Sequence, residues 1–132
     1  MTAQLTKIKD LEPGAVVWNE LAVRETEPEV AFYEAVFGWT HSTAPMGGTE
    51  YTTWSLDGRA IAGMIRMNEQ WPAEIPAHWM VYFAVEDVEA SCARLTELGG
   101  TVSVPPTEIE IGTFAVVNDP NQAFFSLIQM KG

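Results

Sequence analysis

The sequence predicts an α+β protein built from two copies of a βαβββ module. Three observations carry this prediction: an internal echo at constant spacing, one helix in each half that ends at glycine, and three strand-like runs after each helix. Leu21-Ala22-Val23 is echoed by Phe83-Ala84-Val85, 62 positions later, and Asp57 is echoed by Asp119 at the same spacing. This period and this order of elements indicate a duplicated module rather than a solenoid repeat.

The first module is expected at about residues 14–67. Thr26, followed three residues later by Glu29, has the form of a capping box that begins a helix, and Gly38 is suited to end it. An apolar face for this helix is expected from Val30, Phe32, Val36 and Phe37. The predicted elements are a strand at 16–23, a helix at 27–37 and strands near 40–44, 51–56 and 61–67.

The second module is expected at about residues 78–130, with the whole chain, 1–132, forming one domain. Asp87 is a good N-cap, because its carboxylate can accept free backbone N–H groups, and Gly99-Gly100 ends the helix. Residues 68–77, with Pro72 and Pro76, are interpreted as a linker. The predicted elements are a strand at 79–85, a helix at 88–98 and strands near 102–104, 113–118 and 123–129.

Charge and composition exclude some classes of partner. Seven basic residues against 18 acidic ones give a net charge of −11, which repels phosphate groups and argues against nucleic acid or an anionic membrane. No apolar stretch approaches the roughly 20 residues of a membrane span. The N-terminus is polar and lacks the apolar core of a secretory signal, and the single cysteine, Cys92, cannot form an internal disulfide. These features predict a cytoplasmic protein.

Three sequence segments resemble the vicinal-oxygen-chelate superfamily, which includes glyoxalases, bleomycin-resistance proteins and dioxygenases. The run Phe32-Tyr33-Glu34-Ala35-Val36-Phe37-Gly38-Trp39 is similar to its FY-x-x-x-FGW signature. The segments at 84–90 and 117–121 resemble the start of the second module's helix and its Asp-Pro turn. The resemblance implies that the two modules pair so that their curved mixed sheets form an open funnel. It also implies a homodimer, because dimers are frequent among similar proteins.

The same resemblance bears on metal binding. Metal-dependent members hold a divalent ion with four side chains, one from the first and one from the last strand of each module. Three of these positions fall on Trp18, Met80 and Ser126, and the fourth falls within residues 62–64, with Gly63 the best match. None is a usual ligand of a hard or borderline divalent ion. We therefore expect no family-type metal site and no cofactor.

Glu20 is the candidate catalytic residue. Strand alternation points it into the predicted funnel with Trp18, and a carboxylate among apolar side chains could serve as a general base or anchor a ligand. The competing interpretation is structural, with Glu20 bonded to Tyr82, Arg66 or backbone. His78 could shuttle a proton or lie at a strand end. The predicted ligand-binding set is Trp18, Glu20, Trp54, Met64, Arg66, His78, Met80, Tyr82 and Ser126.

Two main functions remain open at this stage, beside a weaker third, an interaction or assembly module that dimerises through edge strands and surface aromatic residues. The first is a metal-free protein that binds a small aromatic or hydrophobic molecule in the funnel. The alternative is a lyase, isomerase or dioxygenase, using a divalent metal or Glu20 as base, that acts on a small oxygenated substrate. Superfamily membership and one predicted buried carboxylate support the alternative, so whether a reaction is catalysed stays open.

Overall fold

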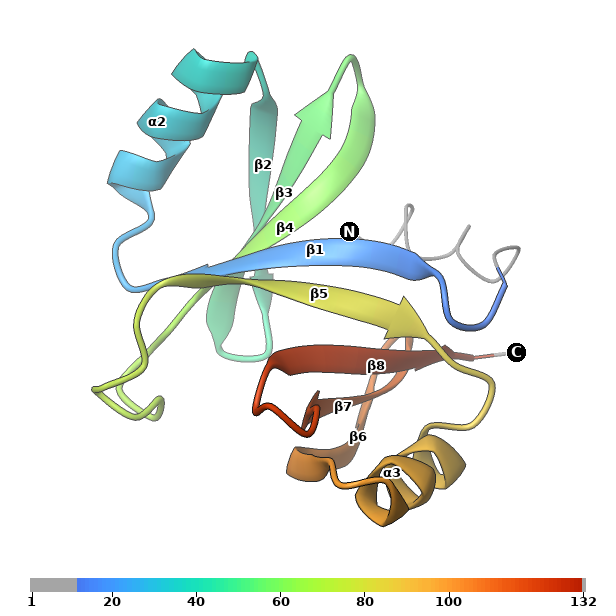
Figure 1. Ribbon diagram of the computed structural model, residues 1–132. Coiled ribbons are helices and arrows are strands. Elements are labelled where there is room, and N and C mark those ends of the chain that lie inside the picture. Colours follow the sequence, from blue (N-terminus) through green and yellow to red (C-terminus); the bar gives the residue numbers. More distant parts are fainter. Residues whose placement is uncertain (1–11, 132) are drawn as a thin grey trace. The chain divides into compact units, whose positions relative to one another are not determined.

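The computed structural model describes residues 12–131 and divides them into two compact units (Figure 1). The first unit is Asn19–Trp79, and the second comprises the described residues up to Trp18 and those from Met80 onward. Within residues 12–131 there are two helices and eight strands, in the open, mixed sheet order β2-β3-β4-β1-β5-β8-β7-β6. The predicted α+β class is confirmed. The funnel depends on how the units are placed and stays a prediction.

The first unit has the predicted order of elements. Strands β2, β3 and β4 form an antiparallel meander, and β4 then runs parallel to β1. Figure 1 shows α2 alongside this group of strands. The helix bounds match the prediction, whereas the three later strands begin or end up to two residues away from it. The elements are β1 (Val16–Val23), α2 (Glu27–Phe37), β2 (Thr40–Met46), β3 (Thr49–Leu56) and β4 (Arg59–Arg66).

The core of the first unit lies between α2 and one face of its strands. Leu21 and Val23 of β1 point to this side, as strand alternation predicts, and Trp54 and Met64 are completely buried beside them. From the helix, Tyr33 packs against this cluster. Trp54 is therefore the largest side chain buried between α2 and the strands. Its burial contributes much of the free energy that holds α2 against them.

Helix α2 departs from the prediction at its start and on its surface. The capping box is wrong: Thr26 has helical dihedral angles and makes no side-chain cap hydrogen bond, whereas a capping residue is normally extended. The predicted apolar face is only partly buried, because Phe32, Val36 and Phe37 are each more than half exposed. Gly38 does end the helix, with the left-handed φ of 74° that glycine adopts without strain.

The second unit repeats the arrangement with different anchoring. Strand β5 runs parallel to β8, and β8, β7 and β6 follow antiparallel. The described residues up to Trp18, which include the start of β1, also belong to this unit. Just before β1, Gly14 N donates to Ala84 O (2.7 Å) and Ala84 N donates to Ala15 O (3.0 Å). The prediction had placed β1 wholly in the first module. The elements are β5 (His78–Ala84), α3 (Val88–Glu97), β6 (Thr101–Ile109), β7 (Gly112–Asn118) and β8 (Phe124–Met130).

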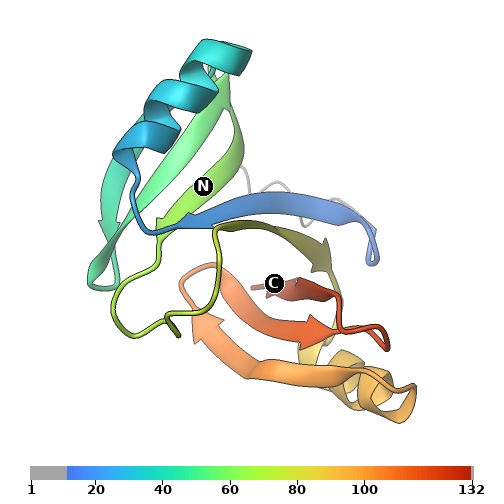
Figure 2. The same cartoon turned by 60° about the vertical axis from the view of Figure 1, so that its left-hand side comes forward.

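Helix α3 is held at its start and along its length, and it lies beside β6 in Figure 2. Asp87 caps it as predicted, accepting from Ala90 N at 3.0 Å. Val88 N donates to the side-chain oxygen of Gln129 at 2.8 Å. Val88 and Cys92 are buried in an aliphatic cluster, against which Phe83 packs from β5. The predicted helix-facing side of this strand is therefore confirmed at Phe83.

The largest error in strand length concerns β6. The prediction placed this strand near residues 102–104, but it runs from Thr101 to Ile109 and includes Pro105 and Pro106. Strand β6 is at the edge of the order, where a missing N–H costs no ladder hydrogen bond. Register shifts at 102–104 and 104–107 accommodate the prolines.

Neither helix among residues 12–131 has the length and apolarity needed to cross a membrane.

Candidate functional site

The face of the first unit that carries Glu20 is the one turned away from its helix-side core. Glu20 pairs with Gly63 across β1 and β4, and Leu21 pairs with Met64 in the core. Side chains alternate along a strand, so Glu20 and Gly63 share the opposite face. Thr53 of β3 is the other partner of Gly63. We call this surface of Glu20, Tyr51, Thr53 and Gly63 the Glu20 face.

A tyrosine occupies the space above Gly63. A Cβ added at Gly63 would lie 2.8 Å from Tyr51 Cε1 and closer still to the hydroxyl oxygen. Tyr51 is buried, and it belongs to the Glu20 face because it lies two residues before Thr53. The sequence-based prediction missed Tyr51. The available signal was a glycine inside a strand, which often marks a close approach by another group.

The corresponding face of the second unit carries Ser126. Ser126 pairs with Tyr82 on β5 and with Val116 on β7, while the adjacent Leu127 lies in the helix-side core. Ser126 is fully buried, and its hydroxyl has no hydrogen-bond partner. A buried hydroxyl without a partner costs about 1–3 kcal/mol and calls for an explanation. We call this surface of Tyr82 and Ser126 the Ser126 face.

Three residues of the predicted ligand-binding set lie on the helix side instead. Trp54 and Met64 are completely buried in the core of the first unit. Arg66 is two residues beyond Met64 on β4, so it shares that side and is exposed. It is therefore not on the face of its predicted partner Glu20. The alternation of β1 and β5 was assigned correctly, but the face of β3 and β4 could be assigned only from the strand pairing.

The remaining predicted residues have varied surroundings. Trp18 is buried, whereas Met80 and Tyr82 are half-buried on β5. The His78 ring contacts Pro76 O through Nδ1 at 2.8 Å, and it lies 6.4 Å from the Trp71 ring. This local contact favours the strand-end interpretation of His78.

The residues at the four family ligand positions do not fit a divalent metal. Trp18 offers no donor atom, Met80 a thioether and Ser126 a neutral hydroxyl, and the Tyr51 ring fills the space at Gly63. Metal sites of this kind need imidazole, carboxylate or thiolate ligands. Among residues 12–131, no group of three or more His, Cys, Asp or Glu side chains is placed to hold a metal ion.

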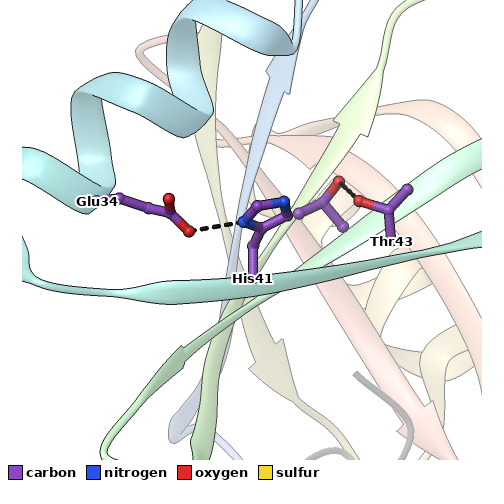
Figure 3. Close-up of polar contacts among 4 residues, drawn as sticks. Glu34, His41 and Thr43 are labelled. Atoms are coloured by element: carbon purple, nitrogen blue, oxygen red, sulfur yellow. Dashed lines mark hydrogen bonds and ion pairs between the residues drawn. The ribbon is translucent and has the colours of Figure 1, made fainter.

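A histidine–carboxylate pair lies on the helix side of the first unit. His41 Nδ1 on β2 is 2.6 Å from Glu34 Oε2 on α2, and both side chains are about one-third exposed (Figure 3). Thr43, two residues along β2, shares a hydrogen bond of 3.0 Å with Thr52. The Glu34–His41 pair joins α2 to the edge strand β2. It lies on the side of the strands opposite to Glu20.

The segment between the modules is held by one arginine. Arg24, directly after β1, donates through Nη2 to Pro72 O at 2.9 Å and to Ile75 O at 3.0 Å. Trp71 lies in this segment and is half-buried near His78. Arg24 therefore positions the segment that carries Trp71.

The family can now be identified. The model of the Glyoxalase/Bleomycin resistance protein/Dioxygenase superfamily matches residues 15–127, and the chain belongs to this superfamily. A Mycobacterium tuberculosis protein named "Putative glyoxylase CFP32" is 38% identical over 120 residues, which are 89% of this chain and 45% of that protein. The "Anthracycline biosynthesis protein DauV" of Streptomyces sp. (strain C5) is 33% identical over 128 residues, 87% of this chain and 46% of that protein. The chain thus spans less than half the length of these relatives.

Solved structures share the fold at low sequence identity. Methylmalonyl-CoA epimerase in complex with methylmalonyl-CoA and NH4+ has a TM-score of 0.65 at 18% identity, covering 92% of this chain and 97% of that one. The hypothetical protein BH1468 of Bacillus halodurans has a TM-score of 0.68 at 11% identity, covering 92% and 97%. At such identities these matches show the fold alone.

Proposed function

We propose that this chain is a superfamily member that binds a small, neutral aromatic or hydrophobic molecule without a metal ion. The observation that carries the proposal is the buried, unpartnered hydroxyl of Ser126 on the face turned away from α3. A ligand atom or a water could satisfy this hydroxyl. The negative net charge of the chain disfavours an anionic ligand.

A thermal-shift measurement tests the proposal with three probes of equal shape: benzamide, acetophenone and α-methylstyrene. A binder is stabilised by RT ln(1 + [L]/Kd). We expect Ser126→Ala to leave the free protein as stable or more stable, because the unsatisfied hydroxyl is removed, and to weaken benzamide binding roughly fivefold to tenfold. Ser42→Ala, at an exposed serine of β2, is the matched control. No shift with any probe, or equal binding by Ser126→Ala, would contradict the proposal.

The alternative function is enzymatic, with Glu20 as general base. Its support is the position of Glu20 beside Tyr51, which puts a carboxylate and a phenol on one face, and the glyoxylase name of one relative. The metal-dependent version predicts stoichiometric Ni, Zn, Fe or Mn in protein purified without an affinity tag. A metal-free preparation would leave only the version in which Glu20 acts alone, and Glu20→Gln would then abolish any turnover.

We also propose a homodimer that covers the exposed apolar surface of α2. Phe32, Val36 and Phe37 are 56%, 54% and 54% exposed, and Trp79, whose ring contacts Tyr33 of α2, is 39% exposed. An exposed apolar patch of this kind on one helix is typical of a protein–protein contact, and a second copy of the chain would cover it. Light scattering is expected to show a dimer and Val36→Lys a monomer, with Ala31→Lys, on the other side of α2, as the control. A monomeric unmodified protein would refute the dimer.

The remaining proposed properties concern partners and location. The net charge supports the absence of nucleic acid and membrane partners. A reducing cytoplasm suits the free, buried Cys92. Fractionation of cells that express the native gene tests the location, and recovery outside the cytoplasmic fraction would overturn it.

A further inference from the structure

The two edge strands, β6 and β2, differ in how well they are protected against pairing with another strand. Proteins protect an exposed edge with prolines, charged side chains or bulges. Strand β6 has all three, in Pro105, Pro106, Glu108 and two register shifts. Strand β2 has no Asp, Glu, Lys or Arg and a single proline near its end, and it pairs with β3 without a register shift. The open edge of β2 is therefore a regular template for a further strand.

The turn between β2 and β3 decides which backbone groups of β2 face outward. Gly47 and Gly48 form this two-residue turn with φ of 54° and 86°, and a type I′ turn needs positive φ at both positions. Such a turn closes with a hydrogen-bonded pair, which here is Met46 and Thr49. Hydrogen-bonded and non-hydrogen-bonded pairs alternate along an antiparallel ladder. Every second residue of β2, counted back from Met46, therefore bonds to β3, and the others face away.

The outward positions of β2 are His41, Thr43 and Pro45. His41 and Thr43 each present a backbone N–H and C=O, and Pro45 presents a C=O alone. A proline at an outward position agrees with this assignment, because no ladder hydrogen bond is lost there. Within residues 12–131, β3 is the only strand beside β2, and all seven residues of β2 are exposed.

The part of the chain around this edge is acidic throughout. Residues 25–58, which form α2, β2 and β3, contain six Asp or Glu residues and no Lys or Arg. Glu34 contacts His41 from α2, and Glu50 on β3 is the partner of Pro45, so both carboxylates lie on the helix side of β2. A second copy of this edge would bring like charges together, whereas a strand with basic side chains would be attracted.

We propose that the open edge of β2 binds an extended, basic segment of a partner protein, which adds a strand to the first unit. The backbone of the segment pairs with the outward groups of His41 and Thr43, and its lysine or arginine side chains lie on the helix side near the two carboxylates. The interaction is independent of the proposed ligand. It also uses a different flank of α2 from the proposed contact between copies, because Phe32 and Val36 are each two residues, or more than half a turn, away from Glu34.

Titration calorimetry on the full chain tests the proposal with an acetylated and amidated heptapeptide of alternating lysine and valine. Side chains of directly paired residues share a face, so lysines that lie beside the carboxylates turn their own backbone N–H groups toward β2. N-methylation of three lysine backbone nitrogens should therefore abolish binding. N-methylation of the three valine nitrogens is the matched control and should leave the affinity unchanged. The peptide with glutamate in place of lysine should not bind.

Two variants at one position test the same edge from the side of the protein. Thr43→Pro removes an outward N–H and should weaken the lysine–valine peptide roughly tenfold. Thr43→Val is its matched control, because it also loses the side-chain hydrogen bond to Thr52 but keeps the N–H, and it should bind as the unmodified protein does. Circular dichroism checks that both variants are folded. The N-methylated peptides give the same test on the unmodified protein if a variant does not fold.

Each other outcome overturns the proposal. Equal binding of the two N-methylated peptides would mean that charge alone attracts them, and no binding of the unmethylated peptide would mean that the edge accepts no such strand. A smaller particle by light scattering for Thr43→Pro than for Thr43→Val would mean that the edge pairs with a second copy instead. None of these results bears on the proposed ligand binding, which the thermal-shift measurement tests separately.

Discussion

The two helices occupy equivalent places in the duplicated module and are held in different ways. Helix α3 buries Val88 and Cys92 and begins at a side-chain cap on Asp87. Helix α2 buries none of its residues completely and lacks a side-chain cap. Its attachment comes from rings, with the Tyr33 ring 5.5 Å from Trp39 and 5.6 Å from Trp54. In the same arrangement of elements, a helix can therefore be held against its strands either by buried aliphatic side chains or by stacked aromatic rings.

The largest expected effect is the loss of the central ring of the first unit. Trp54 is completely buried between the helix and the strands. Trp54→Ala should lower the free energy of unfolding by about 3–5 kcal/mol, because it leaves a cavity of a tryptophan's size. Chemical denaturation monitored by circular dichroism measures this.

Trp54→Phe is the matched control for that change. It keeps a ring and removes the indole N–H, which has no hydrogen-bond partner. We expect it to cost clearly less than Trp54→Ala. Equal losses would show that ring volume does not hold α2.

Substitutions at the first residues of the two helices should have effects of intermediate size on the free energy of unfolding. Asp87→Ala should cost about 1 kcal/mol, because the bond to Ala90 N is lost. Thr26→Ala should change stability by less than about 0.5 kcal/mol, since Thr26 makes no cap bond. The same denaturation experiment measures both. A loss of similar size at Thr26 would contradict the observed geometry of α2.

The pair that joins α2 to β2 should contribute less than a cap. Glu34 and His41 are about one-third exposed, so solvent screens their attraction. His41→Ala should lower stability by no more than about 0.5 kcal/mol, and at a pH where His41 is protonated the difference should shrink in high salt. Thermal melts at two salt concentrations test this. A larger, salt-independent loss would mean that packing, not charge, holds the contact.

The smallest effect on stability at neutral pH concerns Cys92. Burial raises the pKa of the Cys92 thiol above its ordinary value, and the nearby Glu89 charge raises it further. The native thiol is therefore harder to ionise than the unfolded one. Its contribution to stability is complete below the unfolded pKa and is lost as the pH rises through the native pKa. No change is expected at pH 7.

The pH dependence of the reaction with a chromogenic disulfide reagent reports that difference. At pH 8 the native thiol should react more slowly than the thiol in denaturant, because less thiolate is present and Cys92 is buried. Glu89→Gln should increase the native rate slightly. Equal rates in both states would refute the raised pKa.

Prediction from the sequence succeeded where local signals were sufficient. The end of α2, the cap at Asp87 and the helix-facing side of β1 follow from glycine, an N-cap and strict alternation. It did not foresee that Trp54 and Met64 pack in the helix-side core, because the face of a strand in the middle of a meander depends on its partners. The length of β6 was missed because prolines are compatible with a strand only at an edge.

The sequence by itself determined the duplicated module, its helices and the residue types at the ligand positions, since spacing, caps and chemistry are local properties. Only the tertiary structure placed the Tyr51 phenol in the space above Gly63 and left the Ser126 hydroxyl without a partner. Both features depend on how each strand pairs with its neighbours. Register, which no single strand encodes, decides which side chains meet there.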